Sequence, residues 1–149
     1  GYYSTNHGGG GEILDDEIRG DISPLKCTSE EWLNVHREAH KAGLKTTATM
    51  MIGLGENIRH RINHLEKVRQ VQDDTGGITA FIPWTFQPEH TELAKRNLPE
   101  VTATEYLRML ALSRIYLDNI DLSIWEVMAQ EHRNATRSKA HNKHGTTIR

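Results

Sequence analysis

This 149-residue chain has a single cysteine, Cys27, and that scarcity excludes an internal disulfide framework. Small secreted domains commonly rely on disulfides, so one cysteine favours a reducing compartment. No apolar run approaches the ~20 residues that a membrane-spanning helix needs, and no signal peptide opens the sequence. The sequence therefore predicts a cytoplasmic chain with no membrane partner.

An excess of charge of one sign is also absent. The formal net charge is −2, so nothing electrostatic points to nucleic acid as the main partner. Hydrophobic residues make up only 36% of the chain, and much of the polar excess lies in its last twenty or so residues. The chain is long enough for one domain with a core, but too short for a complete eight-stranded barrel of ~250 residues. Because no initiator methionine is present, we expect it to begin inside a larger protein.

Three apolar or β-branched segments are predicted to be strands: Leu44–Ile52, Ile78–Trp84 and Asp121–Met128. Pro83 predicts that the end of the second strand leaves the hydrogen-bonded ladder. Segments with helical periodicity separate these strands. Their spacing suits right-handed crossovers between parallel strands.

Four helices are predicted, at about residues 14–19, 28–42, 58–74 and 102–117. Capping boxes mark two of the starts, one formed by Thr28 and Glu31 and the other by Thr102 and Glu105. The residues expected to form the buried stripes of the three longer helices are Trp32, Leu33, Val35, His36, Ala39 and Ala42; Ile58, Ile62, Leu65, Val68 and Val71; and Tyr106, Leu107, Leu110, Ile115 and Leu117.

The fold class predicted by this alternation is α/β, as a partial (β/α) TIM-type barrel with parallel strands and about three to four βα units. Residues 1–128 form the partial barrel. Residues 129–149 are polar and locally basic, without apolar periodicity, and are expected to be a disordered tail. Contact of this tail with nucleic acid is the less favoured alternative to a solvated run.

A glycine-rich segment ends in Glu12 and is the first candidate binding feature. Gly10 and Gly11 let backbone N–H groups approach a ligand closely, while the Glu12 carboxylate can accept from an amine or from ribose hydroxyls. The segment has neither a Walker loop sequence nor the spacing of a dinucleotide fingerprint. Taken alone, it is better explained as a flexible turn.

Polar side chains also follow or line the predicted strands. Thr46, Thr47 and Thr49 lie among apolar residues, so some of their hydroxyls are expected to point toward the barrel axis while others pack outward; threonine is also simply a good strand former. Glu56 lies in the loop after the first strand, where barrels place functional groups and where a surface glutamate is equally ordinary. Trp84, Thr85 and Gln87 offer a stacking face and two polar groups for a nucleoside-like ligand; the alternative is a tryptophan that plugs the barrel mouth.

The nine histidines do not predict a metal site. His60 and His64 share a helix face, as do His36 and His40, but neither pair has an adjacent acidic cluster, and both are expected to lie on solvated faces. Cys27 precedes a capping threonine, which could lower its pKa. Because the sequence identifies no residue that would act as a base for this thiol, a structural role for the cysteine is favoured.

Five segments, in order, resemble a family of radical S-adenosylmethionine enzymes, the cyclic dehypoxanthinyl futalosine synthases of the menaquinone futalosine pathway. They are GGGGEILDDEIR, ISPLKCTSEEWL, AHKAGLKTTATMM, QDDTGGITAFIPWTFQP and LALSRIYLDNI. The resemblance covers about residues 8–120. It implies a barrel that binds S-adenosylmethionine and a 4Fe–4S cluster, with an external electron donor and dehypoxanthine futalosine as the small-molecule substrate.

The resemblance also assigns residues. Glu12, with Gly10 and Gly11, matches the block expected to contact S-adenosylmethionine. The residues expected to line the substrate cavity are Thr47, Thr49, Glu56, Trp84, Thr85 and Gln87, with Arg114 and Asn119 as weaker candidates.

Departures from the family pattern limit what this chain is expected to do alone. The CxxxCxxC cluster motif is absent, and Leu54 stands where the family usually has a histidine. We therefore expect a central to C-terminal piece that is inactive by itself. The alternatives are a piece of the related aminofutalosine synthase or deazaflavin (FO) synthase, a nucleoside-binding module that uses Glu12, Trp84 and Gln87, and an inert, partly folded remnant.

Overall fold

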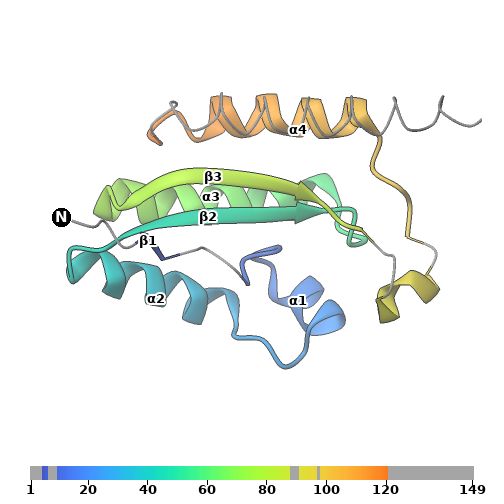
Figure 1. The fold of residues 1–149 in the computed structure, drawn as a ribbon, viewed down its shortest axis with the longest axis horizontal. Coiled ribbons are helices and arrows are strands. Elements are labelled where there is room, and N and C mark those ends of the chain that lie inside the picture. Colours follow the sequence, from blue (N-terminus) through green and yellow to red (C-terminus); the bar gives the residue numbers. More distant parts are fainter. Residues whose placement is uncertain (1–4, 7–9, 88–90, 97, 121–149) are drawn as a thin grey trace, which may run out of the picture.

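The computed structural model describes residues 5–6, 10–87, 91–96 and 98–120. Figure 1 shows strands at the centre, with α2 along one side, α4 along the other and α3 behind them. The elements in chain order are β1 (Thr5–Asn6), α1 (Asp16–Ile22), α2 (Ser29–Lys41), β2 (Lys45–Ile52), α3 (Ile58–Thr75), β3 (Ile78–Thr85), the 3₁₀ helix η1 (Glu92–Arg96) and α4 (Ala103–Tyr116).

The strands form a parallel sheet in the order β1-β2-β3. This confirms an α/β fold with parallel strands joined by helices. Strand β1 lies within residues 1–12, whose glycine-rich, polar sequence indicates a loop or the frayed remains of a strand. Closure of the sheet into a barrel stays a prediction. The predicted strand Asp121–Met128 and the predicted tail 129–149 lie outside the described residues.

Strand β3 runs further than expected, through Pro83 to Thr85. Pro83 lies opposite Met50 within the paired region, so the prediction that it leaves the ladder is wrong. The Phe86 N–H donates to the Ile52 carbonyl at 2.8 Å. Because N–H groups alternate in direction along a strand, those of residues 84 and 82 point the same way as that of Phe86. The missing N–H of Pro83 then lies on the side away from β2, where the ladder does not need it.

Local capping signals place the helix ends. The Thr28–Glu31 capping box is present in full. The predicted Thr102–Glu105 box is confirmed in part, by the bond in which Thr102 accepts from the Glu105 N–H at 3.2 Å. Helix α1 begins later than predicted, because Asp15 caps it and the residue before it, Leu14, is fully buried outside the helix. Strand β2 begins at Lys45, one residue later than predicted.

The core lies between the helices and one face of the sheet, but the stripes that cover it are narrower than predicted. Five residues assigned to the buried stripes are exposed: Val35, Ala42, Ile58, Leu107 and Ile115. Each helix packs along one side only, so apolar residues at the margin of the stripe face outward. In α4 the buried positions are Tyr106, Met109 and Ser113, and Met109 and Ser113 were not predicted.

The two faces of the sheet differ. Ala48, Met50 and Phe81 belong to the buried core under the helices. The opposite face carries the alternate residues of β2 together with their partners in β3, because register partners lie side by side on one face. We call this second face the threonine face; its members are Thr47, Thr49, Met51, Ala80, Ile82 and Trp84.

Within the ranges described, no helix combines the length and the apolar character needed to cross a membrane.

Candidate functional site

Three segments meet at the edge of the sheet where β2 and β3 end, which we call the carboxyl edge. The Glu12 carbonyl accepts from the Met51 N–H at 2.6 Å, so the glycine-rich segment lies against the last residues of β2. Met51 is in turn the register partner of Trp84. The backbone therefore brings Glu12, β2 and the Trp84 segment together. Carboxyl edges are where parallel α/β folds bind ligands.

The glycines of the first segment have structural roles. Gly10 has a φ of 84°, in the left-handed region that favours glycine. A Cβ on Gly11 would lie 3.0 Å from Trp32 Cζ2 and 3.2 Å from the Thr49 carbonyl oxygen. Gly11 is thus required by the packing of the segment between α2 and β2. Its contact with S-adenosylmethionine stays a prediction.

The Glu12 carboxylate forms an ion pair with the Lys26 ammonium, which comes from the turn between α1 and α2. The Glu12 side chain is 19% exposed and that of Lys26 is 43% exposed. Lys26 shows that this carboxylate accepts an ammonium group at the carboxyl edge. A carboxylate accepts in the same way from a ligand amine or from the hydroxyls of a ribose diol.

Three side chains that the sequence analysis did not assign hold the backbone around Glu12. The Arg19 guanidinium donates to the Gly10 and Ile13 carbonyls, the Leu14 N–H donates to His64 Nδ1, and Lys67 donates to the Leu14 carbonyl. A signal for His64 existed, since it precedes Val68 and Val71 by four and seven positions and so belongs to their stripe. No comparable signal marks Arg19.

Two histidines of the predicted pairs are buried: His64, which was expected on a solvated face, and His36, which was assigned both to a solvated face and to the buried stripe of its helix. His64 is fully buried, and burial lowers its pKa to about 3. His36 is also buried; its ring lies 3.8 Å from that of Trp32, and burial lowers its pKa to about 4. Both imidazoles are therefore neutral near pH 7. The buried-stripe assignment of His36 is confirmed, and the expectation of a solvated face is wrong for both residues because residues from other elements cover these helix faces.

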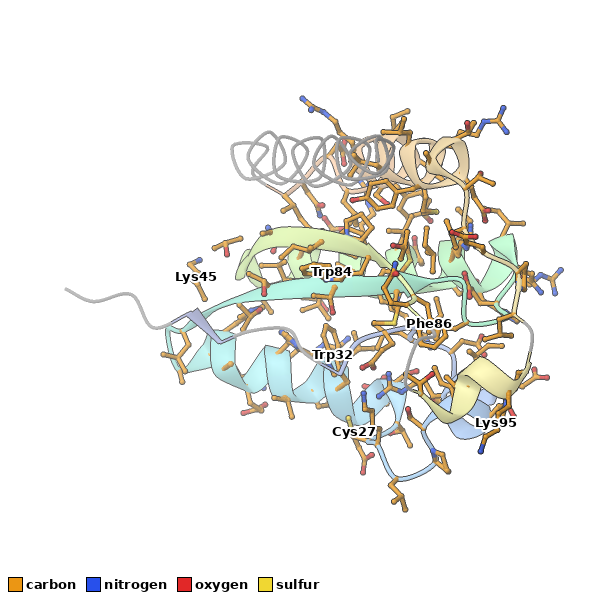
Figure 2. All side chains as sticks on the ribbon, turned by 45° about the vertical axis from the view of Figure 1, so that its right-hand side comes forward. Cys27, Trp32, Lys45, Trp84, Phe86 and Lys95 are labelled. Atoms are coloured by element: carbon orange, nitrogen blue, oxygen red, sulfur yellow. The ribbon has the colours of Figure 1, made fainter. Side chains whose placement is uncertain are left out.

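The threonine face meets the carboxyl edge at Trp84, whose side chain is 49% exposed. Figure 2 labels Trp84 over the strands, with Trp32 on the α2 side. Thr47 and Thr49 are half-buried on the same face of β2. A flat aromatic surface beside hydroxyl groups suits a nucleoside-like ligand.

Thr85 and Gln87 do not share this face with Trp84. Thr85 is the register partner of Ile52 and lies on the helix-covered side of the sheet. Its hydroxyl accepts from the Gln87 side-chain amide at 3.1 Å. The two residues lie at the carboxyl edge, but the structure separates them from the exposed indole ring. Their contact with substrate stays a prediction.

Glu56 is used within the chain. Its fully buried carboxylate accepts from the Gly53 N–H at 3.0 Å and the Leu54 N–H at 2.6 Å, and pairs with Arg61 at 2.7 Å. These bonds fix the loop after β2, including Leu54, where a histidine is usual in the family that the sequence resembles. Contact of Glu56 with substrate stays a prediction.

Arg114 and Asn119 do not join the carboxyl edge. Asn119 donates to Asp73 at 2.7 Å, and its carbonyl accepts from Gln72 at 3.0 Å. These partners lie at the end of α3, next to the start of β3, so Asn119 is at the opposite end of the sheet. Arg114 is exposed in the last turn of α4.

Cys27 is exposed, and its carbonyl accepts from Arg19 Nη2 at 2.6 Å. Over the described part of the chain, no group of three or more histidine, cysteine or acidic side chains is placed to hold a metal ion.

Comparisons with known proteins bear on these residues. A family model described as the CofH/MqnC C-terminal region matches residues 75–143. The cyclic dehypoxanthine futalosine synthase of Halalkalibacterium halodurans is 43% identical over 143 residues, which are 95% of this chain and 38% of that protein.

Two further relatives carry other names. The aminodeoxyfutalosine synthase of Thermus thermophilus is 42% identical over 75% of this chain and 31% of its own. The 5-amino-6-(D-ribitylamino)uracil–L-tyrosine 4-hydroxyphenyl transferase 2 of Methanococcus maripaludis is 42% identical over 74% of this chain and 32% of its own. The chain thus spans about a third of the length of these relatives.

Proposed function

Because the chain belongs to the CofH/MqnC family, we propose that it is part of a radical S-adenosylmethionine enzyme with a nucleoside-like substrate. The observation that carries this proposal is the meeting of Glu12, β2 and Trp84 at the carboxyl edge of a parallel sheet. In the whole enzyme, this edge forms one wall of a cavity in a cytoplasmic (β/α) barrel.

The reaction proposed is the cyclisation of dehypoxanthine futalosine to cyclic dehypoxanthinyl futalosine in menaquinone biosynthesis. It is favoured because, of two relatives that align over 143 residues, the one of that name is 43% identical and one named as a 4-hydroxyphenyl transferase is 37% identical. Relatives with other names align over about three quarters of this chain at 42% identity. Their identity is almost as high, so the aminodeoxyfutalosine and 4-hydroxyphenyl transferase reactions are the alternatives.

The residues at the carboxyl edge fit S-adenosylmethionine. Lys26 already places an ammonium against the Glu12 carboxylate, and the methionine ammonium of the cofactor has the same chemistry. When bound, the cofactor supplies a 5′-deoxyadenosyl group for radical chemistry. Trp84 and the threonine face hold and shield the nucleoside part, which keeps water away from the reacting atoms.

The residues do not fit a 4Fe–4S cluster. Such clusters are held by several cysteine thiolates, and the chain contains one cysteine. We therefore assign the cluster ligands, and the docking of an external electron donor, to parts of the whole enzyme other than this chain. The chain alone is expected to be inactive. A non-catalytic nucleoside-binding module is the second candidate, favoured by the same lack of thiolates.

Complementation tests this function. The chain is assembled with the N-terminal part of the Halalkalibacterium halodurans relative, and cleavage of S-adenosylmethionine to 5′-deoxyadenosine is measured. We expect cleavage with the native chain and a loss of about 100-fold with Glu12→Gln, because a misplaced ligand reacts poorly. Glu17→Gln is the matched control, since Glu17 is exposed in α1. Correct assembly without cleavage would leave only the nucleoside-binding candidate.

A further inference from the structure

The segment Gly10–Leu14, which we call the glycine loop, is held by buried polar side chains on two sides. On one side lies Arg19 of α1, which is 4% exposed. Its Nη1 donates to the Gly10 carbonyl at 2.9 Å and to the Ile13 carbonyl at 3.2 Å. Its Nε and Nη2 donate to the Cys27 carbonyl, just before α2. One guanidinium thus joins both ends of the turn around Glu12 to the start of α2.

The hydrogen-bond acceptors of Arg19 are backbone carbonyls, and arginine suits them better than lysine. Among the described residues, no carboxylate lies within ion-pair distance of Arg19. A buried cation is costly unless its donors are satisfied, and the planar fork of arginine satisfies several acceptors in a fixed geometry. Lysine has a point charge on a flexible stem and cannot span the same three carbonyls.

On the other side lies His64 of α3, which is fully buried. Its Nδ1 accepts from the Leu14 N–H at 3.0 Å, so the ring must be neutral with its proton on Nε2. Lys67, one turn further along α3, donates to the Leu14 carbonyl at 2.7 Å. The end of the glycine loop, at Leu14, is therefore held by two hydrogen bonds to α3. The middle of the loop is held by the hydrogen bond from the Met51 N–H to the Glu12 carbonyl.

We propose that Arg19 and His64 are positioning residues that set the backbone of the glycine loop and thereby the place of the Glu12 carboxylate. Neither side chain needs to touch the ligand. The proposal concerns the same site as the proposed function and rests on it for its link to S-adenosylmethionine. The shape of the loop itself can be tested without any ligand.

Amide hydrogen exchange of the native chain gives the ligand-free test. Two amides report on the glycine loop: the Leu14 N–H donates to His64 Nδ1, and the Met51 N–H donates to the Glu12 carbonyl. The amide of the buried residue Val68 reports on the core. With Arg19→Lys we expect the two reporters to exchange about tenfold faster, the equivalent of one net hydrogen bond, while Val68 is unchanged. Arg37→Lys is the control, since Arg37 pairs with Glu30 on the surface of α2.

His64 provides a second pair of variants, should Arg19→Lys fail to fold. His64→Asn keeps an acceptor near the position of Nδ1, and His64→Leu removes it. We expect asparagine to retain the protection of the Leu14 amide and leucine to lose it. If amide exchange becomes faster at the reporters and at Val68 together, the two residues only stabilise the fold and the proposal is wrong. If no variant makes exchange at the reporters faster, the two side chains do not hold the loop, and the proposal is wrong as well.

The link to the ligand is tested in the assembled enzyme with S-adenosylmethionine as the probe. Arg19→Lys should raise the KM for S-adenosylmethionine about tenfold. When Glu12→Gln is already present, Arg19→Lys should raise this KM by less than about twofold, because the effects of coupled residues are not additive. Full additivity would overturn the proposal that Arg19 acts through Glu12. Failure of the native assembly to bind the probe would count against the proposed function, and the exchange experiment would still decide the role of Arg19 and His64.

Discussion

His36 and His64 are buried imidazoles that are uncharged near neutral pH, because burial lowers their pKa to about 4 and about 3. Each uses Nδ1 within the fold: His36 bonds to the Thr46 hydroxyl at 2.9 Å, and His64 accepts from Leu14. Protonation of His64 would abolish its acceptor. The two residues therefore connect the protonation state of single side chains to the stability of the chain.

The pH dependence of unfolding follows from these pKa values. Histidines in the unfolded chain bind protons near pH 6.5, well above the folded values, so the unfolded state binds more protons between pH 6.5 and about 4. Stability is thus fully present above pH 6.5 and falls as the pH drops through this window, by up to ~1.4 kcal/mol per pH unit for each histidine.

Urea unfolding of the native chain and of His64→Asn at pH 7.5, 6 and 5 measures this effect. We expect the free energy of unfolding to fall more steeply in the native chain, since asparagine does not titrate. Equal slopes in the two proteins would show that His64 is accessible to protons in the folded state.

At the scale of elements, a chain of side-chain hydrogen bonds joins α2, β2 and α3 where the strands begin. Thr75 donates to the Val71 carbonyl, so its hydroxyl accepts from His40 Nδ1 at 2.6 Å. His40 Nε2 must then accept from Thr46 at 2.8 Å. Gly77 packs against this junction, since a Cβ there would lie 2.2 Å from the His40 ring.

Gly77→Ala tests that junction. The methyl group has no space beside the imidazole, so we expect a loss of about 1–3 kcal/mol in the free energy of unfolding. Gly20→Ala is the matched control, because Gly20 is exposed in α1 with nothing near its absent Cβ, and alanine there should stabilise by up to about 1 kcal/mol. The two values come from urea unfolding curves. A neutral Gly77→Ala would mean that His40 can move out of this junction without cost.

Local signals predicted the elements better than they predicted burial. The Thr28–Glu31 capping box depends on residues three apart, and the structure contains it as expected. Val35 and Leu107 fit a helical apolar stripe, yet both are exposed, because the width of the covered stripe depends on what packs against it. The burial of His64 depends on Leu14 and Phe81, fifty and seventeen residues away in the sequence, and no local pattern contains that information.

At the scale of the whole molecule, the parallel sheet explains which candidate residues meet. Carboxyl ends of parallel strands share one edge, so Glu12 and Trp84 could be brought together from sequence alone. The rule does not give the face on which a side chain lies, and it therefore failed to separate Thr85 from Trp84. It also says nothing about α4, whose end carries Arg114 and Asn119 away from the edge.

We propose that residues 1–128 belong to a partial barrel whose interior is the threonine face, with residues 129–149 as a tail. The half-buried state of Thr47, Thr49 and Ile82 supports an interior role, since they are less covered than the core face of the same strands.

The most direct test of the shared site uses 5-fluorotryptophan in the assembled enzyme, with the fluorine resonance of Trp84 assigned by Trp84→Phe. On addition of S-adenosylmethionine, we expect the Trp84 resonance to shift saturably, and we expect Glu12→Gln to abolish the shift. If the ligand binds while the Trp84 resonance stays unchanged, then Glu12 and Trp84 do not serve one cavity.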